Sequence, residues 1–237
     1  MAVPRDRLEW MHDGEAFFLG GLDSLGDDDL REPSGLPGWS RAHVVSHFSR
    51  NARALVNLLD WARTGVTTPM YPSVEARAEG IEEGSHQSAA DLRAEAHAAS
   101  QQLQDATAAM PEAAWEGEIR TALGRATTGA EVPWMRVRET WVHAVDLDAS
   151  VQIDQIPDAI ALALIDEVTT TLNSRDDCPG VVLRATDTSR DWTMGAPDGA
   201  VTLKGAQAVI LGWVIGRSRG DGLHASGGTL PPPPRWM

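Results

Sequence analysis

One segment of the chain combines helical spacing of apolar residues with ionisable groups on the same side. In the segment 134–146, Glu139 and His143 are four residues apart, so on a helix they share one face with Met135 and Val142. A carboxylate and an imidazole on an otherwise apolar face are costly to bury unless a cation pairs with them. The spacing therefore predicts a helix that carries a cation-binding pair on its inward face.

A second segment repeats this pattern around His47. Ser40 is a suitable N-cap, and the helix is expected to run past Trp61 and to end at Gly65. A divalent metal shared by the two helices would compensate both sets of groups, because two histidines and one glutamate form a ligand set of catalytic zinc sites. The inward stripe of this helix has helical spacing and consists of Val44, His47, Phe48, Asn51, Leu55 and Leu58.

Spacing alone leaves other interpretations open. Glu139 and His143 also fit a surface pair worth about a few tenths of a kcal/mol, and a lone helical histidine such as His47 is more often a satisfied core or surface group. His43, one turn before His47, is a competing ligand. Asp146, three residues after His143, fits either a fourth ligand or an acceptor for an imidazole N–H.

Charge and cysteine content restrict the functional class. The chain has 237 residues and a formal net charge of -14, which argues against nucleic-acid and anionic-membrane partners. Cys178 is the only cysteine, which excludes an internal disulfide and favours a reducing compartment, and its acidic neighbours disfavour a nucleophilic role. The first residues lack the apolar core of a signal peptide, and the most apolar run, 206–216, is too short to span a bilayer. We therefore expect a cytoplasmic protein.

Hydrophobic periodicity divides the chain into two domains and predicts an α+β protein. Residues 1–154 are expected to form an antiparallel four-helix bundle that holds the metal. Besides the helix that begins after Ser40, the expected helices cover 5–20, where Gly20 and Gly21 end the first, 91–110, and Pro133 to about Ala149. The other expected elements are a strand pair, 116–121 and 126–128, that turns at Gly124, whereas 71–86 is interrupted by Pro72 and Gly80 and is assigned no element.

Residues 155–237 are expected to form a small α+β domain whose helices cover one face of a sheet. The expected helices cover 157–172 and 206–217, and the expected strands 181–184, 191–194 and 200–203. Arg217, at the end of the second helix, fits an anchor for a carboxylate, and it fits a cap for the helix C-terminus equally well.

The two histidine-bearing helices resemble those of the mycothiol-dependent maleylpyruvate isomerase family, within the wider DinB-like thiol-transferase superfamily. The similarity rests on Gly38-Trp39-Ser40 with Val44 and His47, and on 134–136 with 141–146. It extends along nearly the whole chain and includes Asn51, Leu58, 61–62, 64–65, 68–71, 75–77, 216–217 and 235–236.

This resemblance implies zinc ligands at His47, Glu139 and His143, a non-ligand position at His43, and a groove arginine at Arg217. It implies a DinB-like helical domain followed by a domain similar to sterol carrier protein 2. The implied activity is the mycothiol-dependent cis–trans isomerisation of maleylpyruvate to fumarylpyruvate in gentisate breakdown, a pathway of aromatic catabolism.

The expected cofactors are zinc and mycothiol, and the expected partners are small molecules. Two other functions fit the same residues. One is a zinc-dependent mycothiol S-transferase that acts on electrophilic xenobiotics, and the other is a metal-responsive binding protein without turnover.

Overall fold

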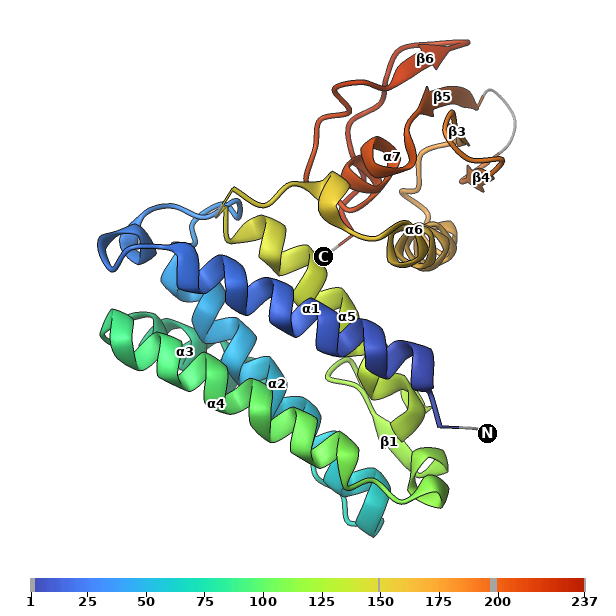
Figure 1. Cartoon of the computed structure of the whole chain (residues 1–237). Helices are drawn as coiled ribbons and strands as arrows, with labels where there is room; N and C mark the ends of the chain where they lie inside the picture. The colour runs from blue at the N-terminus through green and yellow to red at the C-terminus, as the bar shows by residue number, and fades with distance from the viewer. Residues whose placement is uncertain (1–2, 149, 197–199, 237) are drawn as a thin grey trace. The chain divides into compact units, whose positions relative to one another are not determined.

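The computed structural model describes residues 3–148, 150–196 and 200–236, and the chain divides into two compact units (Figure 1). The helical unit is Met1–Val151 and the sheet unit is Gln152–Met237. Long helices build the first, and a small sheet with two main helices builds the second, so the predicted α+β class is confirmed. The domain boundary predicted after Asp154 stays a prediction.

Four long helices build the helical unit as a bundle. α1 packs against α4 and α5, and α2 packs against the same two helices, so each of the four has two neighbours (Figure 1). Their bounds are Arg5–Ser24 for α1, Arg41–Thr64 for α2, Ala89–Ala108 for α4 and Val132–Asp146 for α5. The core between them is apolar and includes Phe18, Leu22, Leu30, Val44, Val45, Phe48, Leu92, Ala96, Ala144 and Leu147.

The ends of α2 follow from its flanking residues. His43 Nδ1 accepts a hydrogen bond of 3.2 Å from the backbone N–H of Ser40, which forms half of a capping box. Gly65 ends the helix with φ of 73°, a left-handed conformation that favours glycine. The predicted bounds of this helix are confirmed.

The first helix is longer than predicted. α1 continues through Gly20 and Gly21 to Ser24, so its predicted end at Gly20 is wrong. Leu22 is fully buried in the core beside Phe18, and burying a leucine offsets the roughly 1 kcal/mol per glycine that disfavours a helix. The last helix of the bundle, α5, ends at Asp146, and its predicted end near Ala149 lies outside the described residues.

A further helix, α3 (Val74–Ser85), occupies the stretch that was assigned no element. The Ser73 side chain accepts a hydrogen bond of 3.1 Å from the backbone N–H of Ala76 and caps it. A Cβ on Gly84 would lie 2.3 Å from Ser46 Oγ, and one on Gly80 would lie 2.7 Å from Arg50 Nη1. These glycines therefore let α3 lie directly on α2.

Short elements complete the helical unit. The hairpin of β1 (Glu118–Arg120) and β2 (Ala126–Thr128) turns at Gly124 with φ of 79°, as predicted. Three 3-10 helices connect the longer elements: η1 (Asp28–Arg31), η2 (Glu112–Glu116) and η3 (Gly129–Glu131).

In the described part of the sheet unit, four strands form a sheet in the order β4-β3-β5-β6. β3 pairs parallel to β5, and the two outer pairings are antiparallel. α6 and α7 pack on one face, against alternate residues that are buried, whereas the intervening residues of the strands are more exposed. The bounds are Ile153–Gln155 for η4, Asp158–Asn173 for α6, Val181–Ala185 for β3, Asp191–Met194 for β4, Val201–Gly205 for β5, Gln207–Val214 for α7 and His224–Ser226 for β6.

The end of the last helix and one strand of this unit differ from what the sequence predicts. α7 ends at Val214, so Arg217 lies after the helix and not at its last residue. Gly216, with φ of 72°, follows the end of the helix and turns the chain away. The strand β6 was not predicted, because its three residues are all exposed and carry no alternating pattern.

Among the helices of the described residues, none combines the length and apolar character that a membrane span requires.

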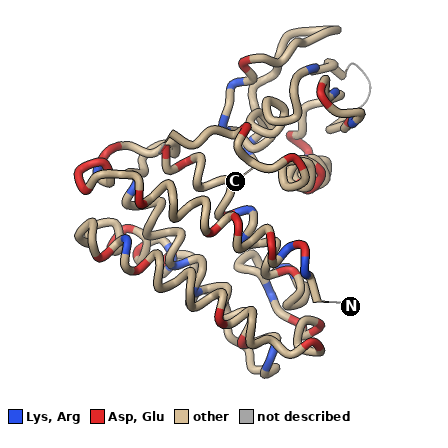
Figure 2. Tube along the Cα trace, viewed as in Figure 1, with Lys and Arg blue, Asp and Glu red and all other residues tan. Residues whose placement is uncertain are grey.

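Charged residues are spread along both units, with basic residues scattered among more numerous acidic ones (Figure 2). Within the helical unit, arginines join distant elements through carboxylates. These ion pairs are Arg7–Glu131, Arg41–Asp148, Arg53–Glu95, Arg93–Asp27 and the fully buried Arg136–Glu15.

Candidate metal centre

α2 and α5 pack against each other and bring His47 together with Glu139 and His143. Glu139 Oε2 lies 2.9 Å from His47 Nε2 and 3.3 Å from His143 Nε2. The two imidazole rings are nearly perpendicular, with centroids 4.8 Å apart. Three ligand-type atoms from two rigid helices therefore converge on one point.

The spacing of these atoms suits one small cation. The three ligand atoms all lie within 4.8 Å of one another. Tetrahedral bonds of about 2.0–2.1 Å to zinc place neighbouring ligand atoms about 3.3 Å apart, which is close to the distances from Glu139 Oε2. Among the described residues, this is the one group of three or more histidine, cysteine or acidic side chains with such spacing.

The two histidines of the cluster are buried and Glu139 is partly buried, and removal from water acts on their charges. Burial alone would raise the pKa of Glu139, but hydrogen bonds from His143 and His47, together with their charges, hold this pKa well below its ordinary value. Burial lowers the pKa of His47, although its hydrogen bond to Glu139 acts in the opposite direction. A divalent metal requires an ionised carboxylate and neutral imidazoles, so Glu139 and His47 already favour the required state, whereas His143 must release a proton when a metal binds.

Asp146 orients the second histidine. Its Oδ2 lies 2.8 Å from His143 Nδ1, and the aspartate is almost fully buried. Burial alone would lower the pKa of His143, but hydrogen bonds to Asp146 and Glu139, together with their charges, raise it to about 9. The contact with Nδ1 leaves Nε2 facing the cluster, so the geometry favours the acceptor role of Asp146 over that of a fourth ligand.

His43 lies outside the cluster. Its Nδ1 takes part in the cap of α2, and its Nε2 lies 3.1 Å from Glu82 Oε2 of α3.

The ring of Trp39 stands edge-on to His47, with centroids 5.7 Å apart, and so covers one side of the site.

Trp141, two residues after Glu139 in the sequence, packs against α1. It stacks on Phe17 and donates its indole N–H to Trp10 O, both in α1.

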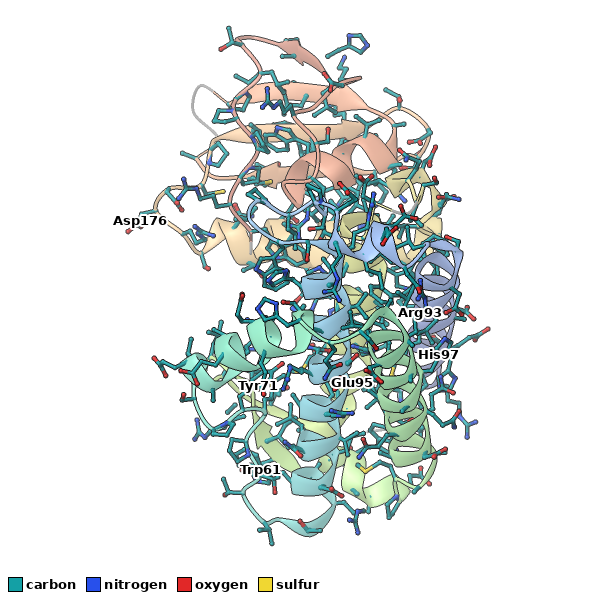
Figure 3. All side chains as sticks on the ribbon, turned by 90° about the vertical axis from the view of Figure 1, so that its left-hand side faces the viewer. Trp61, Tyr71, Arg93, Glu95, His97 and Asp176 are labelled. Carbon is teal, nitrogen blue, oxygen red and sulfur yellow. The ribbon has the colours of Figure 1, made fainter. Side chains whose placement is uncertain are left out.

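The sequence did not identify two further residues beside the cluster. Arg77, in α3, places Nη2 3.4 Å from His47 Nδ1. Its guanidinium carbon lies over the ring of Tyr71, 5.8 Å from the centroid. Tyr71, labelled in Figure 3, precedes α3, and burial raises the pKa of its phenol, to which the charge of Glu139 also contributes. Periodicity could not find them, because α3 itself was not predicted.

The other candidate residues belong to the sheet unit. Arg217 Nη1 donates a hydrogen bond of 3.0 Å to Ile215 O, close to the C-terminus of α7, as the capping interpretation predicts. Burial raises the pKa of the Cys178 thiol, and the charge of Asp177 adds to this effect. A raised pKa keeps the thiol protonated and weakly nucleophilic.

The fold and the site define the class of this protein. It contains a four-helix bundle with a candidate centre for a single divalent metal, formed by two histidines and a glutamate. Residues 11–148 match the family model of the mycothiol maleylpyruvate isomerase N-terminal domain, and the chain belongs to this family. The resemblance found in the sequence is thereby confirmed.

Two solved structures resemble nearly the whole chain. They are crystal structures of a mycothiol-dependent maleylpyruvate isomerase and of a variant with one histidine replaced by alanine. Each is 36% identical in sequence, with a TM-score of 0.94, and the match covers 98% of this chain and 97% of the other. A comparison with curated protein sequences gives no match.

Proposed function

We propose that this protein catalyses the cis–trans isomerisation of maleylpyruvate to fumarylpyruvate, with zinc held by His47, Glu139 and His143 and with mycothiol as the thiol. The observation that carries the proposal is the convergence of these three side chains, in a chain 36% identical over nearly its whole length to an isomerase that depends on mycothiol. When bound, mycothiol supplies a nucleophile that adds to the cis double bond and later leaves, and zinc supplies positive charge that favours a thiolate or an oxyanion.

The residues of the chain prepare the site for this chemistry. His47 and Glu139 are linked by a hydrogen bond, and Asp146 fixes the ring of His143, so the ligand atoms are in position before a metal arrives. His47 and His143 are nearly inaccessible to solvent. Restricted access of water protects a thiolate and a reactive adduct from competing protonation.

The chain itself offers no activated thiol for the addition. Cys178 is the single cysteine, and the raised pKa of its thiol makes it a poor nucleophile at neutral pH. Addition to the double bond therefore requires a thiol from outside the protein, which supports the dependence on mycothiol. Such a thiol would supply reversible addition: its sulfur would bond to one carbon of the double bond while the electron pair moves to the conjugated carbonyl, and its departure after rotation would restore the double bond and the thiol.

The test is a spectrophotometric assay of maleylpyruvate loss by the zinc-loaded protein, with and without mycothiol. We expect turnover only when zinc and mycothiol are both present, and we expect no turnover from His47→Ala. His97→Ala is a matched control, because His97 is an exposed histidine of α4 that pairs with Asp23. Conjugation of electrophiles without isomerisation would identify an S-transferase, and metal binding without either reaction would identify a binding protein.

A separate proposal concerns the role of Arg217 in substrate binding. We propose that its guanidinium holds a carboxylate of the substrate, because a planar fork of donors pairs with a carboxylate through two hydrogen bonds. Arg217→Lys should lower kcat/KM by about tenfold, or about 1.4 kcal/mol, with zinc content unchanged. Unchanged kinetics would leave Arg217 as a cap of α7.

A further inference from the structure

Arg77 is an arginine beside the metal centre whose charge is not balanced by an ion pair. Its contacts are His47 Nδ1 at 3.4 Å, the ring of Tyr71, and the phenol of Tyr71, with which its side chain forms a hydrogen bond. No ion pair joins it to a carboxylate in the part of the chain that the structure describes. This is notable in a protein with 34 acidic and 20 basic residues.

Several other arginines of the helical unit are paired with carboxylates. Arg53 of α2 pairs with Glu95 of α4 at 2.6 Å, and Arg136 pairs with Glu15. Arg77 is half-buried and lies on the centre itself. A cation next to a centre for a divalent metal is unfavourable unless an anion joins them.

Metal binding changes what His47 can offer to Arg77. In the structure, His47 Nδ1 is the nitrogen that faces the guanidinium, while Nε2 faces Glu139. When His47 gives its Nε2 lone pair to a metal, its ring hydrogen lies on Nδ1, which then cannot accept a hydrogen bond. Arginine has only donors, so Arg77 then requires another acceptor.

We propose that Arg77, supported by Tyr71, binds a carboxylate of the dicarboxylate substrate beside the metal centre. This assigns to the helical unit an anion-binding site, and it rests on the proposed function for the identity of the substrate. A guanidinium 3.4 Å from one ligand places a bound carboxylate next to the metal. Arg77 would then fix the substrate so that its double bond meets the thiol in one orientation.

Tyr71 contributes to this site in two ways. Its ring lies under the guanidinium of Arg77, which limits the positions of that side chain. Its phenol lies close enough to Glu139 to respond to that charge. A phenol is also a hydrogen-bond donor, so a carboxylate beside Arg77 has a second donor within the same short segment.

Binding of maleate, a cis dicarboxylate, to the zinc-loaded protein tests the site without turnover. Isothermal titration calorimetry should show affinity reduced about tenfold or more in Arg77→Gln, because a charged hydrogen-bonded partner is lost. Tyr71→Phe should have a smaller effect, since the ring remains. Arg53→Gln is the matched control: it removes the same charge from the same unit and should bind maleate like the unchanged protein. Zinc content should stay at one per chain in all four proteins.

Kinetics separate this role from a structural one. In Arg77→Gln, KM for maleylpyruvate should rise while KM for mycothiol stays the same, and Arg77→Lys should recover part of the loss. Equal maleate affinity in Arg77→Gln and the unchanged protein would overturn the proposal, as would a rise confined to KM for mycothiol. An unchanged protein that binds maleate through Arg77 but does not isomerise maleylpyruvate would support the anion site and contradict the proposed function.

Discussion

Glu15 and Glu139 are carboxylates that lie between helices of the same bundle, one fully buried and one partly buried, and their surroundings differ in kind. Glu15 of α1 is fully buried, and its two oxygens contact Arg136 Nε at 3.0 Å and Gln104 Nε2 at 3.2 Å. Glu139 of α5 uses one oxygen to contact two imidazoles, at His47 and His143. The first carboxylate has a permanently charged partner, whereas the second has imidazole partners, a residue type that can also bind a metal.

This difference distinguishes a structural ion pair from a binding site. The guanidinium of Arg136 has no lone pair to offer, and it also donates to Phe48 O and Asn51 Oδ1, which ties α5 to α2. The imidazoles beside Glu139 each direct Nε2 toward the same carboxylate oxygen. Each of these nitrogens can give up its hydrogen and bind a cation, which a guanidinium cannot do. A charge between helices therefore stabilises their contact at Glu15, whereas at Glu139 it belongs to a candidate metal centre.

Replacement of Glu139 is expected to have the largest effect on the site. Glu139→Gln keeps the size of the side chain but removes the charge that a divalent cation requires. We expect zinc to fall from one per chain to near zero, and turnover to fall with it, while the helical content stays the same. Metal analysis of the dialysed protein and circular dichroism measure both. Full zinc content in this variant would show that Glu139 is not a ligand.

Replacement of Arg136 should instead affect folding. Arg136→Met leaves Glu15 buried without a partner charge, and loss of one partner of a buried pair costs about 3–5 kcal/mol. Urea denaturation should show this decrease in the free energy of unfolding. The double variant Arg136→Met with Glu15→Gln removes both charges and should recover a large part of the loss. Equal stability of the single and double variants would contradict the assigned role of the pair.

The sequence predicted that His47, Glu139 and His143 lie together, but it did not predict the Arg136–Glu15 ion pair, for a physical reason. His47, Glu139 and His143 lie on helices with strong periodicity, and two of them are neighbours on one helix face. Glu15 and Arg136 are 121 residues apart, and neither forms a local pattern with its partner. Local spacing can indicate that a face is buried, but it does not show which distant charge will meet it.

The helix α3 shows the same limit in another form. Pro72 and Gly80 are residues that usually interrupt helices, and local propensity gave no reason to expect a helix between them. In the structure, the helix begins after Pro72, and its glycines face α2. Close packing against α2 therefore decides the conformation here, and with it the position of Arg77.

The third prediction concerns the support of His143. Asp146→Asn keeps the size of the side chain but weakens the contact of 2.8 Å with His143 Nδ1. Loss of such an outer partner costs about 10–100-fold in metal affinity, so zinc should bind more weakly without being lost at saturating concentration. Competition with a chelating dye measures the change. Unchanged zinc affinity would show that Asp146 has a structural role, as Arg136 does, and does not support metal binding.

The fourth prediction uses the contact between α3 and α2. A Cβ on Gly84 would meet Ser46 Oγ at 2.3 Å, and a serine side chain is too short to move away, so Gly84→Ala should cost about 1–3 kcal/mol. Gly80→Ala is the control, because its Cβ would meet the flexible end of Arg50. Thermal denaturation should show a lower Tm for the first variant and little change for the second. Similar Tm values for both would mean that close packing does not hold α3 in place.

The smallest effect is expected in the sheet unit, at Cys178. Burial and the charge of Asp177 raise the pKa of its thiol, so the protonated form dominates at neutral pH. Cys178→Ser should therefore leave kcat and KM within about twofold of the unchanged enzyme, and the thiol should react with iodoacetamide more slowly than a free cysteine at the same pH. If Cys178→Ser instead abolished turnover while zinc stayed bound, the nucleophile would belong to the chain. An external thiol acting at the cluster of His47, Glu139 and His143 would then not be enough to explain turnover.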